Sequence, residues 1–488
     1  MWLRRDLRLE DNVALAGASA QSDEVACVFV LDPELLRGPR VGAPIVQFFF
    51  SALDGLRADL REHGSDLVLL EGDFAAELVR FARHIGARAV FYNHDYDPAT
   101  IERDERVETA LRAAGIEPVS SLDHVIAGAD EVLQDDGRPY SVFTPYSRKW
   151  MQRTGGGGDR RPVASREPAL RKLLAAQTIG ATREVPAPEA YGHQTSDRFP
   201  IGDERSARTA LASFIASKGG AYDGQRDFPA IDGTSHLSPH LRAGTIGIRT
   251  CVSAAFDAQR TAPKRAAENL GVWIGELCWR DFYQQILKNV PRVAYRPYRE
   301  DSQHIVWRDD EAGWNAWAQG KTGYPIVDAA MVQINTYGWM HNRLRMIVAS
   351  FLTKDLLIDY HEGERYFEQH LADGDLAQNN GGWQWSASTG NDAAPYFRVF
   401  NPTLQGKKFD PDATFIRAMI PALRSVPDAY VHEPWTMPPL VAAAARCEIG
   451  NDYPAPIVDH AQARVRAIET FGRVFGRANE PKRVAGRR

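Results

Sequence analysis

The sequence predicts two domains: an α/β domain built on a doubly wound, Rossmann-like parallel sheet, and a large all-helical domain that follows it. The chain has 488 residues and a mass of 54.3 kDa, which is more than one hydrophobic core usually organises. Short apolar runs alternate with helical patterns at first, whereas the patterns beyond residue 205 are mostly helical. We expect an α/β domain over residues 1–130, a linker over 131–205, a helical domain over 206–475 and a basic tail over 476–488.

Strand-length apolar runs and helical stretches follow one another in the first domain. Residues 25–31 form such a run and end at Asp32-Pro33, as a buried parallel strand does. The next elements are a helix over 46–63, a strand over 66–70, a helix over 74–85, a strand over 89–92, a helix over 101–114 and a strand near 118–119. This order is typical of a doubly wound parallel sheet, although no Gly-x-Gly-x-x-Gly follows any strand. Because Met1-Trp2-Leu3 is short for a first strand, we expect the native start to lie upstream.

Residues 151–205 differ from their surroundings in composition. They hold four consecutive glycines, Gly155 to Gly158, and the prolines Pro186, Pro188 and Pro200. The glycines lack the following Gly-Lys-Ser/Thr of a phosphate loop, so we expect an extended linker over the surface. Helical spacing then predicts helices over 207–218, 266–289, 326–331, 343–357 and 362–371.

Composition excludes several classes of protein. The chain is 44% hydrophobic and 25% charged, so wholesale disorder and a collagen-like fibre are excluded. Its four cysteines include no Cys-x-x-Cys pair, which argues against a disulfide framework, a zinc site or an iron–sulfur cluster. No apolar leader and no run of about 18 apolar residues occurs. We expect a cytoplasmic monomer that binds no metal and does not enter the membrane.

A tryptophan cluster and a turn-rich segment in the helical part each have a ligand-binding interpretation beside a purely structural one, which for most single tryptophans is bulk in a large helical core. The formal net charge of −5 gives no overall attraction to DNA, so DNA binding needs a local basic patch. Eight of the 11 tryptophans lie between residues 273 and 385. The turn-rich segment 222–239 suits a phosphate, because hydroxyl and backbone N–H groups precede a helix there. A Ser/Thr capping turn explains the same segment without a ligand.

The chain resembles the photolyase/cryptochrome flavoproteins over nearly its whole length, most closely the class I cyclobutane pyrimidine dimer photolyases of microbes. The matching segments are 2–8 with Asp11-Asn12, 233–237, 273–283, 322–330, 338–345 and 374–402. The resemblance implies an α/β antenna domain, a long linker and a helical domain that holds FAD in a U-shaped conformation below a DNA-facing cavity.

The resemblance assigns the FAD-binding residues by motif position. Tyr222, Thr234, Ser235, Leu237 and Ser238 would hold the pyrophosphate and its surroundings. The flavin and its cavity would be lined by Trp273, Glu276 and Arg280, by an Arg345–Asp373 ion pair and by Asp375. Asn379 would lie opposite flavin N5, where an amide can both donate and accept a hydrogen bond.

The resemblance also assigns a lesion pocket and a DNA-binding rim. Glu276 and Trp279 lie three residues apart on a predicted helix and share a face, and with Asn342 and Met346 they would receive an extruded dinucleotide lesion. Contacts to DNA would come from Arg226, Arg343 and Arg398 at phosphates and from Trp385. The implied reaction is light-driven repair of DNA by an electron from photoexcited reduced FAD.

One position departs from the family's electron relay. The relay would start at Trp383 and end at Trp307, but its middle position is Tyr360. Because tyrosine oxidises less easily and must lose a proton, we expect slower photoreduction, or a detour through Trp385 and Trp317.

The predicted antenna pocket also departs from the family's pattern: Ala99-Thr100 stands where a folate-binding relative has an Asn-Glu pair. A deazaflavin, a second flavin, a folate and an empty pocket stay open as alternatives.

Other functions explain less of the sequence. A cryptochrome-type photoreceptor is the main alternative, because the same fold can signal after flavin photoreduction. The 6-4 photoproduct class expects a histidine pair where this chain has Asn342 and Met346. A universal-stress or electron-transfer-flavoprotein module would leave the helical part unexplained. A metalloprotease lacks a histidine at the required spacing from His361-Glu362, and His341 is expected to be a core or cavity histidine.

Overall fold

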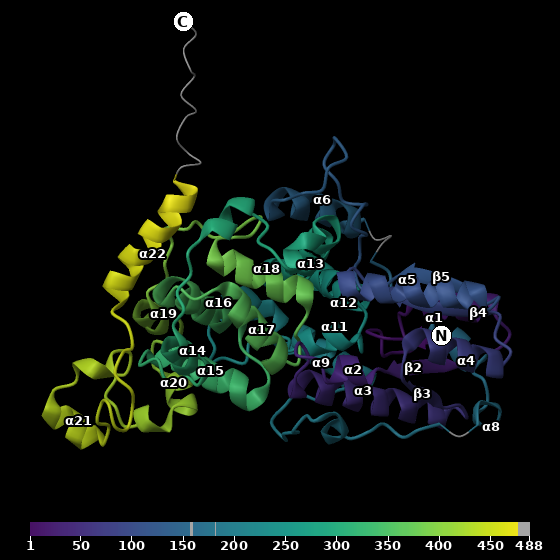
Figure 1. Cartoon of the computed structure of the whole chain (residues 1–488), viewed down its shortest axis with the longest axis horizontal. Helices are drawn as coiled ribbons and strands as arrows, with labels where there is room; N and C mark the ends of the chain where they lie inside the picture. Colours follow the sequence, from purple (N-terminus) through teal and green to yellow (C-terminus); the bar gives the residue numbers. More distant parts are fainter. Residues whose placement is uncertain (157–159, 181, 477–488) are drawn as a thin grey trace, which may run out of the picture.

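The computed structural model describes residues 1–156, 160–180 and 182–476. Figure 1 shows the α/β domain at one end of the molecule, around the N-terminus, and the helical domain over the rest, with α21 (Pro439–Ala445) and α22 (His460–Phe475) at the other end. Two of the four consecutive glycines, Gly157 and Gly158, and nearly all of the predicted basic tail lie outside the described residues.

All paired strands of the α/β domain run parallel. They are β1 (Trp2–Leu3), β2 (Cys27–Leu31), β3 (Leu67–Glu71), β4 (Ala89–His94) and β5 (Glu117–Leu122). In register, Val28 of β2 lies opposite Trp2 and Val68, and Ala89 of β4 lies opposite Glu117. β1 contacts β4 without a hydrogen-bonded ladder, so the order is β3-β2-β1-β4-β5. Successive strands are added in one direction from β1 to β3 and in the other direction from β4 to β5, so the strand order reverses between β1 and β4, which is the switch point of a doubly wound sheet.

Helices cover both faces of this sheet. They are α1 (Val13–Gln21), α2 (Pro33–Leu36), α3 (Ala43–Glu62), α4 (Phe74–His84) and α5 (Pro98–Ala113). Alternate strand residues point to opposite faces: Leu3 and Leu67 share a core with α1 and α3, whereas Trp2 and Val68 share one with α4 and α5. The α/β fold class, predicted from the alternation of strand and helix patterns along the chain, is confirmed.

The predicted linker is more structured than expected. Residues Phe143–Gly155 form α6, which packs against α13 (Lys264–Asn289). Its buried residues Tyr146, Trp150 and Thr154 recur every four positions, so one helical stripe joins the core. Short helices α7 (Arg166–Leu170) and α8 (Ala176–Ile179) follow. Beyond them, Thr182 hydrogen-bonds the backbone of β3, so this stretch covers the sheet edge.

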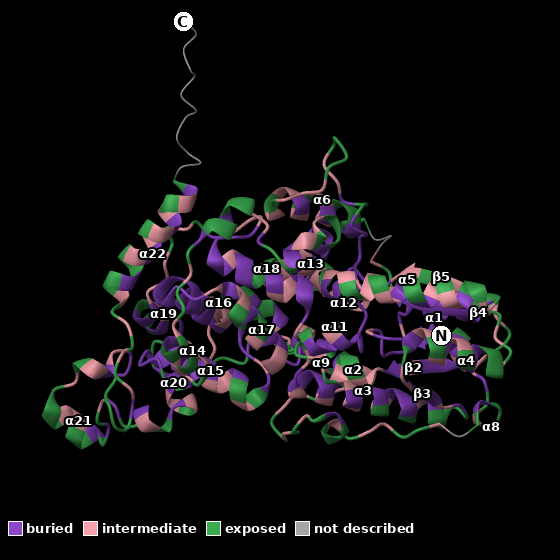
Figure 2. Ribbon diagram, in the orientation of Figure 1, coloured by how far each residue is buried: buried purple, intermediate pink, exposed green. Residues whose placement is uncertain are grey.

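The second domain is helical throughout its described length. Its α-helices besides α13, α21 and α22 are α9 (Glu204–Ser217), α10 (Tyr222–Gln225), α11 (Ser238–Ala243), α12 (Ile248–Thr261), α14 (Glu311–Ala318), α15 (Pro325–Tyr337), α16 (Asn342–Ser350), α17 (Tyr360–His370), α18 (Leu376–Ala387), α19 (Pro402–Phe409) and α20 (Thr414–Met419). A π-helical turn, Phe351–Leu356, extends α16, and 3₁₀ turns span Pro188–Tyr191, Gly219–Ala221, Pro291–Ala294, Glu300–His304, Pro421–Leu423 and Pro434–Thr436. Figure 2 shows the buried residues gathered inside both domains.

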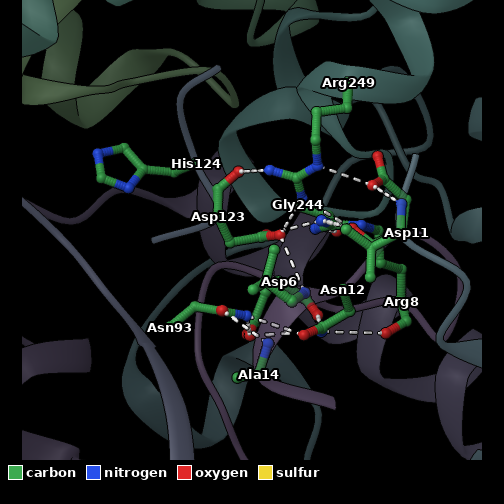
Figure 3. Close-up of polar contacts among 12 residues, drawn as sticks. Asp6, Arg8, Asp11, Asn12, Ala14, Asn93, Asp123, His124, Gly244 and Arg249 are labelled. Atoms are coloured by element: carbon green, nitrogen blue, oxygen red, sulfur yellow. Dashed lines mark hydrogen bonds and ion pairs between the residues drawn. The ribbon is translucent and has the colours of Figure 1, made fainter. Parts of the chain in front are cut away.

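Buried charges join the two domains at the carboxyl ends of the strands (Figure 3). Asp123, directly after β5, forms ion pairs with Arg8 (2.6 Å) and with Arg249 of α12. Arg249 also bonds Asp11 at 2.9 Å. The side chains of all four residues are at most 7% exposed. These contacts hold the helical domain against the carboxyl ends of the strands, next to the candidate site.

Candidate functional site

The site is centred on the loop that enters α18. Arg345 of α16 reaches Asp373 with both terminal nitrogens, at 3.1 and 2.8 Å. The Asp373 side chain is only 4% exposed, so the two parallel hydrogen bonds compensate a buried charge. Arg345 and Asp373, predicted to pair, do so in the structure.

Asp375 is held by both domains. Its side chain caps α18 and accepts from Ala377 N and from Gln284 Nε2 of α13, each at 3.2 Å. Arg5 of the α/β domain pairs with Asp375 and, at 2.8 Å, with Asp95. Burial alone would raise the pKa of Asp375, but Arg5, Arg242 and Arg280 lower it below its ordinary value. Asp375 is therefore an ionised anchor between the domains.

Asn379 lies one turn into α18, beside α17. Its Nδ2 donates to the carbonyl of Glu364 at 2.9 Å, and the neighbouring Asn380 Nδ2 donates to the Glu364 carboxyl group at 3.1 Å. With Nδ2 engaged, Asn379 Oδ1 is the atom left to face a ligand. Burial raises the pKa of Glu364 to about 7.

The predicted phosphate turn precedes α11. The backbone N–H groups of Thr234, Ser235 and His236 donate to no acceptor within the described residues. Gly233 packs closely on α10, since an added Cβ would lie 2.7 Å from Gln225 Cβ. Leu237 is buried, and the exposed Ser238 starts α11. The turn thus presents free donors, as an anion site requires.

Three buried polar atoms have no partner in the described part of the chain: Gln284 Oε1 and Arg242 Nη1, whose side chains hydrogen-bond Asp375 and Gly374, and His341 Nε2 at the start of α16. Such orphaned groups are uncommon, because each costs free energy unless a ligand or water satisfies it. Burial also lowers the pKa of His341 to about 4, so its imidazole is neutral. Together with the free N–H groups of the turn, these atoms fit a polar ligand such as FAD.

Several residues predicted to bind FAD also contact other parts of the protein: Arg280 and Trp273, which are expected to line the flavin, and Tyr222, which is expected near the pyrophosphate. Arg280 donates to the carbonyl of His124 in the α/β domain. Trp273 is 3% exposed and its ring packs 4.8 Å from that of Phe214. Tyr222 is buried beside the same phenylalanine, at 5.8 Å.

Carboxylates pair with the arginines predicted to bind DNA phosphates. Arg226 bonds Glu276 of α13 at 2.7 Å, and Arg343 bonds Asp227 at 2.7 Å. Arg343 also approaches Met346 Sδ at 3.7 Å. The remaining predicted DNA contacts, Trp279, Asn342, Trp385 and Arg398, are at least partly exposed. In this structure Arg398 is the arginine of the set without a carboxylate partner among the described residues.

An aromatic chain leads away from Trp383. An added Cβ at Gly363 of α17 would lie 2.1 Å from the Trp383 ring, so glycine lets α17 pack on it. The Trp383 and Trp317 ring centroids are 6.2 Å apart, and Trp317 stacks on Trp314 at 5.3 Å. The Tyr360 and Trp307 ring centroids are 6.5 Å apart.

A cavity of about 40 Å³ lies at the carboxyl ends of β1, β4 and β5. Its lining includes Arg4, Asn93, Asp95, Thr100 and His124. His124 is drawn in Figure 3, and neither of its ring nitrogens has a partner among the described residues. Ligands of doubly wound sheets bind at this position.

Comparison with known families identifies the fold. Residues 1–168 match the family model described as "DNA photolyase", and residues 273–473 match the one described as "FAD binding domain of DNA photolyase". The chain belongs to the DNA photolyase family. The predicted family, fold class and FAD cofactor of this photolyase are therefore confirmed.

Relatives match this photolyase over nearly its full length. It is 40% identical to the deoxyribodipyrimidine photo-lyase of Escherichia coli K12 (96% of this chain, 98% of the relative) and 42% identical to that of Halobacterium salinarum (97% and 99%). The crystal structure of a class III photolyase from Agrobacterium tumefaciens matches with a TM-score of 0.88 and 34% identity, covering 97% of each chain. The Synechocystis cryptochrome structure, at 24% identity and a TM-score of 0.87, covers 96% of this chain and 98% of its own and shares the fold.

Sequence reasoning missed several residues of the photolyase site. Arg5 lies in a matched motif, but nothing in the motif named Asp375 as its partner. Gln284 and Glu364 carry no signal beyond a polar residue on the buried face of a helix. No group of three or more potential metal ligands occurs among the described residues, and no helix within them is long and apolar enough to cross a bilayer.

Proposed function

We propose that this photolyase splits cyclobutane pyrimidine dimers in DNA. Full-length similarity to enzymes named deoxyribodipyrimidine photo-lyase carries the proposal. The unpartnered polar atoms of Gln284, Arg242 and His341 support a bound FAD at the base of the site. The cryptochrome-type photoreceptor, the alternative function, has support at the level of the fold.

FAD bound here would supply the chemistry of the repair, a light-driven transfer of one electron to the dimer and back. The protein's own groups bind and orient it. The N–H groups of Thr234 and Ser235 would donate to its phosphate oxygens, and the Arg345–Asp373 pair would flank its ring system. Asn379 Oδ1 would accept a hydrogen bond at flavin N5, because Nδ2 is engaged by Glu364.

The lesion would bind on the exposed side of α13. Trp279 offers an aromatic surface for stacking, and Glu276 offers a carboxyl group for base edges. Burial raises the pKa of Glu276, although Arg226 opposes that effect. The carboxyl group therefore takes up a proton more readily than an exposed glutamate and can donate a hydrogen bond to a base carbonyl. Asn342 and Met346 of α16 would complete the pocket.

Dimer repair can be tested directly. Photoreduced protein is mixed with an oligothymidylate that carries dimers and illuminated with blue light while the ultraviolet absorbance of thymine is followed, with a dark control. We expect light-dependent recovery of absorbance, and a Trp279→Ala variant should repair more slowly at limiting DNA because it loses the stacking surface. No recovery with reduced FAD bound would refute dimer repair and favour a photoreceptor.

The exposed Arg398 should contribute a phosphate contact. We expect Arg398→Ala to weaken binding of damaged and undamaged DNA alike and to reduce the slope of log K against log salt by about 1. Fluorescence anisotropy over a range of salt concentrations measures that slope. Arg80→Ala, on α4 of the other domain with a 64% exposed side chain, should leave it unchanged. An unchanged slope in Arg398→Ala would remove this residue from the DNA face.

A second chromophore would bind at the carboxyl ends of β1, β4 and β5, beside Arg4, Asn93 and Thr100, where the cavity of about 40 Å³ would have to widen to admit it. The archaeal photolyase of Sulfolobus tokodaii, 32% identical with a TM-score of 0.81 and covering 97% of this chain and 99% of its own, was solved with two FAD molecules. A deazaflavin, a flavin and a folate all remain candidates here. We also propose that the protein works in the reducing cytoplasm, because its four cysteines are buried free thiols. We propose further that it is a monomer.

A further inference from the structure

The indole of Trp279 is stacked on a phenylalanine from another segment. The rings of Phe143 and Trp279 lie 3.5 Å apart at their centroids, with an interplanar angle of 9°. Phe143 is the first residue of α6, in the segment predicted as a linker, whereas Trp279 lies on α13. One face of the proposed lesion-stacking residue is therefore occupied by the protein itself.

The segment that carries Phe143 is fixed by hydrogen bonds to the helical domain. The N–H of Phe143 donates to Asp392 Oδ2 at 3.0 Å. Asn391 Nδ2 donates to the carbonyl of Ser141 at 2.9 Å, and Gln285 Nε2 of α13 donates to that of Tyr140 at 2.7 Å. The Phe143 ring is thus held from two sides, by α13 and by the loop after α18.

Other aromatic rings adjoin the same indole. The Trp279 centroid lies 5.6 Å from that of Phe282, at 80°, and 5.4 Å from that of Tyr283. Tyr283 is in turn packed against α18, where an added Cβ at Gly381 would lie 2.3 Å from its ring. Trp279 nevertheless stays partly exposed, so part of its aromatic surface is open to a base.

We propose that Phe143 is a positioning residue that holds the indole plane of Trp279 ready for an extruded pyrimidine dimer. This inference rests on the proposed function, since it takes Trp279 as the surface on which the lesion stacks. An indole already held in its bound orientation loses little conformational freedom when the dimer arrives. Undamaged DNA does not extrude its bases as readily, so Phe143 raises discrimination for the lesion rather than general DNA affinity.

The test compares the binding of two duplexes, with and without one thymine dimer, to the full-length FAD-bound protein in the dark. We expect Phe143→Ala to weaken binding of the dimer duplex by up to about tenfold, in line with one aromatic stacking contact, and to leave binding of the undamaged duplex unchanged. Phe143→Tyr keeps a flat ring and should retain discrimination. Phe143→Leu keeps apolar bulk without the ring and should lose it.

Two further variants make the result decisive. Phe256→Ala removes a partly buried phenylalanine of α12 that lies under Arg160, and should leave both affinities unchanged. Trp279→Ala should lose discrimination if the lesion stacks there. If Trp279→Ala loses discrimination and Phe143→Ala and Phe143→Leu do not, the positioning role is overturned while the proposed function stands.

Tighter binding of the dimer duplex by Phe143→Ala would also overturn the inference. If Phe143 occupied the place of the extruded base, Phe143→Ala would bind the dimer duplex more tightly than the unaltered protein. If neither Trp279→Ala nor Phe143→Ala changed discrimination, the lesion pocket itself would be misplaced.

Discussion

Replacing Asp123 by alanine is expected to lower the free energy of unfolding by about 3–5 kcal/mol, because it leaves buried arginine charge uncompensated. Asp123 pairs with Arg8 at 2.6 Å and with Arg249 of the other domain. Its side chain and that of Arg8 are each 3% exposed. Water cannot readily replace the lost carboxylate, so Arg8 would bear most of the cost of desolvation, whereas Arg249 would keep its ion pair with Asp11.

Urea unfolding followed by far-ultraviolet circular dichroism measures this effect. Asp135→Ala, at a fully exposed side chain that pairs with Lys149, is the control and should change stability by no more than about 0.5 kcal/mol. A loss in Asp123→Ala no larger than that of the control would show that the arginines find other partners.

The ion pairs of Asp123 with Arg8 and Arg249 also predict that the free energy of unfolding depends on pH. Burial would raise the pKa of Asp123, but Arg8 and Arg249 lower it to about 2, whereas an aspartate in the unfolded chain titrates near 3.9. A lowered carboxylate pKa stabilises the folded state above the unfolded pKa, and that contribution is lost as the pH falls from about 4 through about 2. Asp123→Ala should therefore flatten the acid limb of the stability profile.

Sequence reasoning found the strands that have continuous apolar runs and missed a helix that lies among glycines and prolines. The run at residues 25–31 predicted β2, because the side chains on both faces of a buried parallel strand are apolar. α6 was missed because the glycines and prolines around it dominated the composition, although Tyr146, Trp150 and Thr154 recur at helical spacing.

Charge pairing could be predicted only through motifs. The Arg345–Asp373 pair followed from a family resemblance, whereas the Arg5–Asp375 pair joins residues 370 positions apart that no local pattern connects. A charged side chain alone does not name its partner, because many opposite charges are available along the chain. For the same reason Arg226 and Arg343 were expected at phosphates, and their carboxylate partners in this structure were not foreseen.

The route of electrons into the flavin site should bypass Tyr360. Oxidation of a tyrosine releases its phenolic proton, and the buried Tyr360 hydroxyl group faces Thr389, whose neutral hydroxyl group is a poor proton acceptor. Burial, followed by the charges of Glu364 and Asp359, also raises its pKa. Trp383 instead contacts the Trp317 ring, which stacks on Trp314, and Trp314 is partly exposed. An electron given by Trp383 to FAD would be replaced from Trp317 and then Trp314, which an added thiol reduces.

Transient absorption of tryptophan radicals after a blue-light flash distinguishes the two branches. We expect Trp317→Phe to slow photoreduction about tenfold or more, which corresponds to about 1.4 kcal/mol or more of added barrier, and Tyr360→Phe to leave the rate nearly unchanged. Tyr360→Trp should accelerate it, because an indole there needs no proton acceptor to be oxidised and connects Trp383 with Trp307. Trp435→Phe, at a ring that contacts Tyr324 and, among the described residues, no ring of either branch, serves as the control. If Tyr360→Phe slowed photoreduction as much as Trp317→Phe, the electron would pass through the tyrosine, and an acceptor for its proton would have to form in the excited protein.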